Sequence, residues 1–216
     1  MDLALPSTDP PVDDGTAATN LRDDVLVALP TYDESENLES IAESILSRGP
    51  RLLIVDDDSP DCTGDIADRL ARNPRVDVLH RPAKSGLGPA YAAGFANDAL
   101  ILCEMDADFS HDPTDLPRLI AAIDGGADMA IGSRYVRGGG VEDWPWRRRV
   151  LSRGGNIYAN LMLGARLSDM TSGFRAFGVE ALRTLRPDDC RASGYAFDIE
   201  MHGALVVPVW RSPKCL

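Results

Sequence analysis

The sequence lacks a long apolar run, a leader and paired cysteines. No stretch approaches the roughly 18 consecutive apolar residues that a membrane-spanning helix needs. The N-terminus, MDLALPSTDPPVDDGTAATN, has neither the basic nor the apolar segment of a secretory signal. The 4 cysteines form no CxxC pair, which without an export signal is typical of reduced thiols rather than disulfides or zinc ligands. We therefore expect a cytoplasmic protein.

Positive charge is also scarce. The 216 residues include 22 Lys and Arg against 34 Asp and Glu, which gives a formal net charge of −12. Nucleic-acid-binding proteins present a basic face, so no nucleic-acid partner is expected. The same charge would repel a phosphate-bearing ligand unless a cation or local basic residues lie at the site. Hydrophobic content of 44% and charged content of 26% are normal for a globular protein.

Short apolar runs alternate with helical periodicity along the chain, which predicts an α/β fold with a mostly parallel, doubly wound sheet. Residues 1–22 read as an acidic, disordered tail, and residues 23–210 as one domain. The predicted strands are Val25–Leu29, Leu52–Val55, Val76–Leu79, Leu100–Met105 and Met129–Ile131. Ligands of such sheets lie at the carboxyl ends of the strands, so the residues that follow each strand are the candidate site.

Four helices are predicted between or after these strands. The first carries apolar residues from Leu38 to Leu46 after an Asp33-x-x-Glu36 pattern that resembles a capping box. The second spans Ile66–Ala71, the third is opened by Pro89, and the fourth by Asp112-Pro113. Further on, the pattern indicates a helix over about Arg147–Leu163, a polar turn over Asp169–Arg175, and a helix followed by a short strand within Gly194–Trp210.

Two acidic motifs follow predicted strands. Asp106-Ala107-Asp108 places two carboxylates where they could hold a divalent ion that also contacts a diphosphate, with turn formation or helix capping as the alternative. In Asp56-Asp57-Asp58 three adjacent acids repel one another, which indicates hydrogen-bonding partners such as a base or the hydroxyls of a ribose. The alternative is a turn formed with Ser59-Pro60-Asp61. His111 is interpreted as structural or solvated rather than as a ligand.

Two basic segments stand out in this acidic chain. RPAKSGLG, from Arg81 to Gly88, supplies Arg81 and Lys84 before a glycine-rich helix start that suits an anion, or it is a plain loop. GxGxxG and GxxxxGK[ST] signatures are absent. Trp144–Arg149 suits a lipid headgroup surface or a phosphate, and the apolar residues after it could face a bilayer interface or pack on the core.

Taken together, these motifs resemble the family 2 glycosyltransferases that make polyprenyl or dolichyl phosphate mannose. The motifs occur in order over about residues 25–201: PTYDE, VDDDSPDCT, RPAKSGLG, EMDADFSHDP, GSRY, the Trp-Arg-rich segment ending SRGGN, DMTSGFR and GYAFDIE. The resemblance implies a GT-A fold (Rossmann-like, one domain), a GDP-mannose donor, Mg²⁺ or Mn²⁺, and a polyprenyl phosphate lipid as acceptor. It also implies an inverting reaction that gives a β-mannosyl phosphate.

The resemblance also implies roles for individual positions. The guanosine part of the donor would be held by Pro30, Tyr32, Glu34, Val55 and Asp57, and its diphosphate met by Asp106, Ala107 and Asp108, with Lys84 as a further donor contact. The metal ligands would be Asp106, Asp108 and Ser110, and the acceptor phosphate would be gripped by Arg134, Arg148 and Ser152. Arg134 would join Asp106 and Asp108 as a catalytic group, because a guanidinium can hold phosphate in line through two hydrogen bonds.

The sequence departs from this family pattern at several positions. Asp33 stands where Asn is usual, Asp58 where a small or neutral residue is usual, and Cys62 where a turn glycine is usual. A turn that needed positive φ at Cys62 would destabilise the fold. After Glu200 the usual basic loop over the donor phosphates does not align, so the domain is expected to be truncated or divergent at its C-terminus.

Two alternatives to the mannosyltransferase remain open. One is glucosyl transfer from UDP-glucose to the same lipid, and the other is a degenerate, non-catalytic nucleotide-binding protein. An active enzyme is expected to work peripherally on the cytoplasmic face of the membrane, either by binding the membrane surface or through a membrane-anchored partner.

Overall fold

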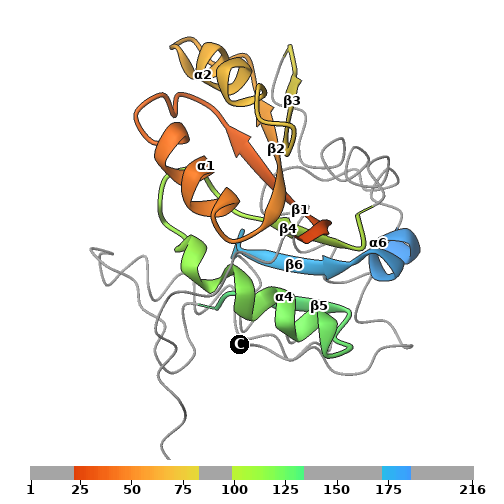
Figure 1. Cartoon of the computed structure of the whole chain (residues 1–216). Helices are drawn as coiled ribbons and strands as arrows, with labels where there is room; N and C mark the ends of the chain where they lie inside the picture. The colour runs from red at the N-terminus through yellow and green to blue at the C-terminus, as the bar shows by residue number, and fades with distance from the viewer. Residues whose placement is uncertain (1–21, 83–98, 134–171, 186–216) are drawn as a thin grey trace, which may run out of the picture.

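The computed structural model describes residues 22–82, 99–133 and 172–185, which form a six-stranded sheet with helices (Figure 1). The order of the strands across the sheet is β3-β2-β1-β4-β6-β5. The strands are β1 (Arg22–Thr31), β2 (Pro50–Asp56), β3 (Val76–His80), β4 (Ile101–Glu104), β5 (Met129–Ile131) and β6 (Arg175–Gly178). The helices are α1 (Leu38–Leu46), α2 (Thr63–Leu70), the 3-10 helix η1 (Pro113–Asp115), α4 (Leu116–Asp124) and α6 (Val179–Leu185).

The sheet is mostly parallel, as the sequence predicts. β1 pairs in parallel with β2 and β4, and β2 pairs in parallel with β3. β6 is the exception, because it lies antiparallel between β4 and β5. The carboxyl ends of β1, β2 and β4 therefore meet along one edge of the sheet, where an α/β protein binds its ligands.

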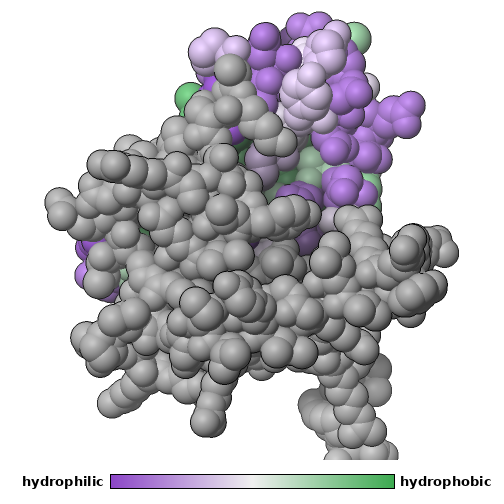
Figure 2. All heavy atoms as spheres, turned by 180° about the vertical axis from the view of Figure 1, so that it is seen from behind, coloured by the Kyte–Doolittle hydropathy of each residue, from purple (hydrophilic) through white to green (hydrophobic). Residues whose placement is uncertain are grey.

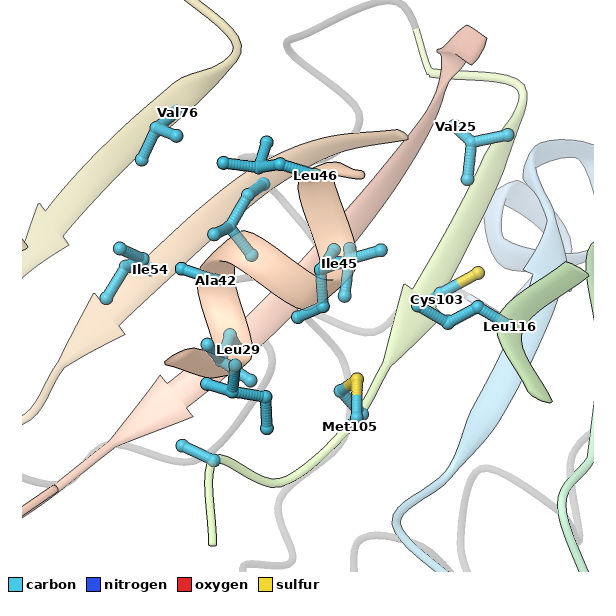
Figure 3. Close-up of a cluster of buried hydrophobic side chains, with 14 of the residues drawn as sticks. Val25, Leu29, Ala42, Ile45, Leu46, Ile54, Val76, Cys103, Met105 and Leu116 are labelled. Atoms are coloured by element: carbon cyan, nitrogen blue, oxygen red, sulfur yellow. The ribbon is translucent and has the colours of Figure 1, made fainter. Parts of the chain in front are cut away.

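The main core lies between the sheet and α1, α2 and α4. Alternate strand residues, such as Val27 and Leu29 of β1, belong to one buried cluster with Ile41 and Ile45 of α1. Figure 3 shows Leu29 and Ile45 within this cluster. The intervening strand residues, such as Leu26 and Leu53, are also buried. Both faces of the sheet are thus covered, as the doubly wound class requires. Seen from behind, the surface near α2 and β3 is mainly hydrophilic (Figure 2).

Two local predictions are wrong. Asp33 and Glu36 form no capping box, because Asp33 lies in a turn with φ of 63° and the residue before α1 is Asn37, whose side chain makes no cap hydrogen bond. The polar turn predicted over Asp169–Arg175 ends early, because Arg175 begins β6. The Asp112-Pro113 prediction is confirmed, since the Asp112 carboxylate accepts a hydrogen bond from the Thr114 N–H at 2.8 Å.

In the described part of the chain, no helix has both the length and the apolar character that crossing a membrane requires. The helices predicted after Pro89 and over about Arg147–Leu163, the elements within Gly194–Trp210, and the Trp144–Arg149 segment lie outside the described residues.

Candidate functional site

The carboxyl ends of β1 and β2 bring predicted donor-binding residues together. Pro30 and Val55 are direct partners in the register of the two strands, and Thr31 and Asp56 are the next pair. The Thr31 hydroxyl donates to the Val55 carbonyl at 3.3 Å, which closes the two strand ends against each other. These two predicted residues therefore share one edge of the sheet, while their contact with a nucleotide stays a prediction.

The loop after β1 is fastened to the loop after β2 by side chains. Three consecutive backbone N–H groups of the first loop donate to side-chain oxygens of the second loop and of Thr63, the first residue of α2. The pairs are Asp33 N–H to Ser59 Oγ (3.2 Å), Glu34 N–H to Thr63 Oγ1 (2.9 Å) and Ser35 N–H to Asp61 Oδ2 (3.1 Å). The hydrogen bonds from Thr63 and Ser35 outweigh desolvation and keep the pKa of the Asp61 carboxyl well below its usual range. Three hydrogen bonds thus tie these two segments together as one unit.

Two further predicted residues, Tyr32 and Glu34, lie in the loop after β1. Tyr32 is 55% exposed, so its ring is available at the rim for stacking. Glu34 is half-buried, and its Oε2 accepts a hydrogen bond from Asn37 Nδ2 at 2.9 Å. The Glu34 carbonyl also accepts from the N–H groups of Asn37 and Leu38, which starts the turn that leads into α1.

Asp57 forms a buried ion pair with Arg81. The side chains are 4% and 6% exposed, and both the Nε and Nη2 atoms of Arg81 contact Oδ1 of Asp57, with Nε donating at 2.6 Å. The Asp57 N–H donates to the Thr31 carbonyl, and the Arg81 N–H to the Asp56 carbonyl. The sequence left Arg81 in an anion-binding segment or a plain loop, and in the structure its guanidinium contacts the Asp57 carboxylate.

Asp56 has a different set of partners. Its Oδ1 accepts a hydrogen bond from the Ser59 hydroxyl, and its Oδ2 lies 3.3 Å from Nδ1 of His80. Nε2 of His80 lies 3.0 Å from Oδ1 of Asp68 on α2. The Asp68 hydrogen bond, with the weaker one to Asp56, outweighs desolvation and raises the pKa of the His80 imidazole. The expected repulsion among the three acids is thus relieved by separate partners for Asp56 and Asp57, while Asp58 is exposed to solvent.

Non-glycine residues with positive φ lie in the loops at this edge of the sheet. In residues 22–82, 99–133 and 172–185, the non-glycine residues with positive φ are Asp33 (63°), Asp58 (59°) and Phe109 (59°). They follow β1, β2 and β4 respectively. Such conformations persist where the surrounding structure holds them, and they cluster at functional sites. The cost that a positive φ at Cys62 would bring does not arise, because its φ is −84°.

The Asp106-Ala107-Asp108 motif follows β4 as predicted. Ala107 is buried, whereas the Asp106 side chain is 49% exposed and Asp108 is exposed. Oδ1 of Asp108 accepts a hydrogen bond from the Ser110 N–H at 2.9 Å. Burial opposes ionisation of Asp108, but hydrogen bonding by Ser110 outweighs it and lowers the pKa of this carboxyl. Asp108 is therefore a carboxylate at neutral pH, as a cation ligand must be.

The turn that leads into β6, the strand beside β4, lies against Asp106. His111 Nδ1 accepts a hydrogen bond from the Asp106 N–H at 3.1 Å, and the imidazole stacks on Phe174 with ring centroids 5.2 Å apart. The Ser172 hydroxyl donates to the Gly132 carbonyl at 2.7 Å and accepts from the Phe174 N–H. The structure confirms that His111 has a structural contact here. The sequence offered no signal that Ser172 and Phe174 would approach this motif.

Beneath the motif lies a buried charge pair between neighbouring strands. Arg175 of β6 is opposite Glu104 of β4 in the register, and its Nε lies 3.8 Å from Glu104 Oε2. The same Nε donates to the Ser172 carbonyl at 2.7 Å. This pair joins the end of β4 to the turn that contacts Asp106, and sequence reasoning missed it.

The donor set at Asp106 and Asp108 suits a hard divalent cation. The described residues include no cluster of three His, Cys, Asp or Glu side chains that could bind a metal by itself. Mg²⁺ typically keeps several waters and uses one or two carboxylates plus substrate phosphates. Two accessible carboxylates, with Ser110 beside Asp108, match that pattern. Four predicted site residues, Lys84, Arg134, Arg148 and Ser152, lie outside the described residues.

Comparisons with known proteins identify relatives of the chain. Residues 26–186 match the family described as Glycosyl transferase family 2. Over 184 residues the chain is 48% identical to the polyprenol monophosphomannose synthase of Mycolicibacterium smegmatis, covering 82% of this chain and 69% of that protein. It is 45% identical over 184 residues to the undecaprenyl-phosphate mannosyltransferase of Micrococcus luteus, covering 82% of this chain and 75% of that protein.

The fold is also found among solved structures. One is the glucosyl-3-phosphoglycerate synthase of Mycobacterium tuberculosis, solved with Mn²⁺, uridine diphosphate and glucosyl-3-phosphoglycerate. The TM-score is 0.61 at 23% identity, over 82% of this chain and 63% of the solved one, so the chain spans less than two thirds of that structure. At this identity the likeness bears on the fold, and it confirms the GT-A class expected from the sequence.

Proposed function

Because this chain belongs to glycosyl transferase family 2, we propose that it transfers mannose from GDP-mannose to a polyprenyl phosphate. The observation that carries the proposal is the identity of 45–48% over 184 residues to two proteins named for mannose transfer to polyprenol or undecaprenyl phosphate. The arrangement of Asp106 and Asp108 at the end of β4 supports a reaction on a diphosphate-linked donor.

We propose that the donor lies across the carboxyl ends of β1, β2 and β4. Pro30 and Val55 would contact the guanosine from adjacent strands, with Tyr32 exposed for stacking and Glu34 and Asp57 as polar contacts. Ala107 and Lys84 would contact the diphosphate. The fastening of the two loops supports this role, because a preformed cradle loses little entropy when the nucleotide binds.

Asp106, Asp108 and Ser110 would hold a Mg²⁺ or Mn²⁺ ion. When bound, such an ion stabilises the negative charge that develops on a departing diphosphate. The two carboxylates have two roles at this position. They supply hard oxygen ligands, and with the cation present the acidic edge no longer repels an anionic donor.

Arg134, Arg148 and Ser152 would bind the acceptor phosphate. A phosphate monoester with a second pKa near 6 is largely a dianion at pH 7, so its oxygen can attack the anomeric carbon without a strong base. The arginines would hold that oxygen in line with the departing diphosphate. A single in-line attack inverts the α-linked donor to a β-mannosyl phosphate. Access to the lipid would come through the membrane surface or a membrane-anchored partner on the cytoplasmic face.

The test is transfer of radiolabelled mannose from GDP-mannose to a polyprenyl phosphate in detergent. We expect transfer by the wild type, loss of transfer on chelation with recovery on added Mn²⁺, and loss in Asp108→Ala. Asp115→Ala removes a carboxylate of η1, where it pairs with Arg118, and should leave transfer unchanged. Arg148→Ala should impair use of the acceptor far more than binding of GDP.

Four outcomes would contradict the proposal. Transfer by Asp108→Ala at the wild-type rate would remove the metal role, and equal losses of acceptor use and GDP binding in Arg148→Ala would remove the clamp. Preference for UDP-glucose in a direct donor competition would replace mannose transfer with glucose transfer. GDP binding without any transfer would favour the non-catalytic alternative.

A further inference from the structure

We propose that His111 and Gly173 are positioning residues for Asp106, which set the direction of its carboxylate and so the affinity of the cation site. The inference rests on the proposed function, because it assigns Asp106 to that site. Neither residue would touch the cation or the substrate. Both would act through the backbone and carboxylate of Asp106.

The contact from His111 is to the Asp106 backbone. Nδ1 lies 3.1 Å from the Asp106 nitrogen and 3.7 Å from Oδ2 of the same residue. A ring nitrogen that accepts from an N–H group must carry its lone pair there, so the geometry assigns the neutral tautomer with the proton on Nε2. β4 ends at Glu104, so this N–H lies beyond the strand, where a side chain rather than the ladder supplies its acceptor.

The His111 ring is itself held in place. Its side chain is only 11% exposed, and its plane lies 14° from that of Phe174. Phe174 is buried, and its backbone is tied to Gly132 and to the Ser172 hydroxyl. The acceptor atom therefore has a fixed position, which a solvated histidine would not offer to Asp106.

Gly173 provides the space that the carboxylate occupies. A Cβ atom at this position would lie 3.2 Å from Oδ2 and 3.4 Å from Oδ1 of Asp106, and 3.5 Å from Cε1 of His111. The Asp106 carboxylate and the His111 imidazole thus both lie against Gly173, which has no side chain. A methyl group there would be closer to Oδ2 than an ordinary contact allows, so this oxygen, which is proposed to bind the cation, would have to move by a few tenths of an ångström.

The expected size of the effect follows from other metal sites. Residues that orient metal ligands typically change metal affinity by about 10- to 100-fold when they are replaced. Two substitutions separate the two features of His111. His111→Phe keeps an aromatic ring on Phe174 but loses the acceptor, and His111→Asn keeps an acceptor at the δ position but loses the ring.

The experiment measures Mn²⁺ affinity in the presence of saturating GDP, by electron paramagnetic resonance of free Mn²⁺, so that it does not depend on mannose transfer. We expect His111→Phe to weaken Mn²⁺ binding at least 10-fold and His111→Asn to stay within about 3-fold of wild type. Gly173→Ala should weaken binding as His111→Phe does. The matched control is Gly178→Ala on β6, where a Cβ would lie 3.6 Å from Cγ2 of Ile123, an ordinary van der Waals contact, and it should bind Mn²⁺ normally.

Unfolding midpoints of all variants show whether each is folded at the assay temperature. The inference is overturned if folded His111→Phe binds Mn²⁺ as wild type does, if His111→Asn is impaired equally, or if the wild type binds no Mn²⁺ with GDP. A wild type that binds Mn²⁺ with this dependence on His111 but transfers no mannose would support the inference and contradict the proposed function.

Discussion

Replacing Arg81 with leucine should destabilise the fold strongly. The change leaves the Asp57 carboxylate, whose side chain is 4% exposed, without the cation that contacts its Oδ1. Removing one partner of a buried ion pair typically costs about 3–5 kcal/mol, because the other charge stays buried and uncompensated. We therefore expect Arg81→Leu to lower the free energy of unfolding by about 3 kcal/mol or more.

A double-mutant cycle separates the ion pair from the other contacts of Arg81. Asp57→Asn removes the buried charge, so Asp57→Asn/Arg81→Leu should be more stable than Arg81→Leu by at least about 1.5 kcal/mol. The measurement is urea unfolding of each variant without nucleotide, with the slope m compared among them.

The matched control is an ion pair on the surface. Arg118 and Asp115 approach to 2.7 Å, but their side chains are 63% and 48% exposed. Arg118→Leu should change the free energy of unfolding by less than about 1 kcal/mol. Two results would show that burial does not govern the strength of this pair. One is a loss in the free energy of unfolding for Arg81→Leu as small as that for Arg118→Leu. The other is additive losses for the changes at Asp57 and Arg81.

Two further changes test other parts of the fold. The pKa of His80 is raised, so its bridge to Asp68 stabilises the fold fully below the ordinary histidine pKa of 6.5 and less as the pH rises through the folded-state pKa. In urea unfolding, His80→Gln should therefore lose more stability at pH 6 than at pH 8.5. An equal loss at both pH values would show that the charge of His80 does not contribute. Gly132→Ala would place a Cβ 2.5 Å from the Phe174 ring and should cost about 1–3 kcal/mol, whereas Gly178→Ala meets only ordinary contacts, and equal midpoints for the two would contradict the close approach.

Much of the fold follows from apolar periodicity. Met129–Ile131 is both the predicted strand and the observed β5, and the apolar positions predicted for α1 are the ones it buries. These elements are predictable because each buries one face against the sheet, and the period of apolar residues records which face that is.

The missed features depend on contacts between distant residues. β6 begins with a charged residue, and Arg175 is stable inside a strand because Glu104 lies opposite it on β4. The Asp33-x-x-Glu36 pattern was misleading because Asp33 turns into the left-handed region, where its N–H bonds Ser59 from another loop. Neither partner is a neighbour in the sequence.

The candidate site divides in the same way. The position of Asp106 and Asp108 after a strand was predictable, because strand ends mark the ligand edge of an α/β sheet. The contacts of His111 and Gly173 with Asp106 were not predictable. His111 meets Asp106 because of the conformation of the loop between them, and Gly173 lies in the turn before β6, a strand that the sequence did not predict.

The place of β6 in the sheet also orders events during synthesis of the chain. β5 leaves the ribosome before β6, yet in the described sheet its partner is β6, which separates it from β4. Until Gly178 has emerged, β4 has an open edge and β5, although it packs on α4, lacks its strand partner in the described sheet. Open edges invite pairing with other chains. A nascent chain paused before this point would therefore be prone to aggregate, and it would be a natural client for a chaperone that covers exposed strands.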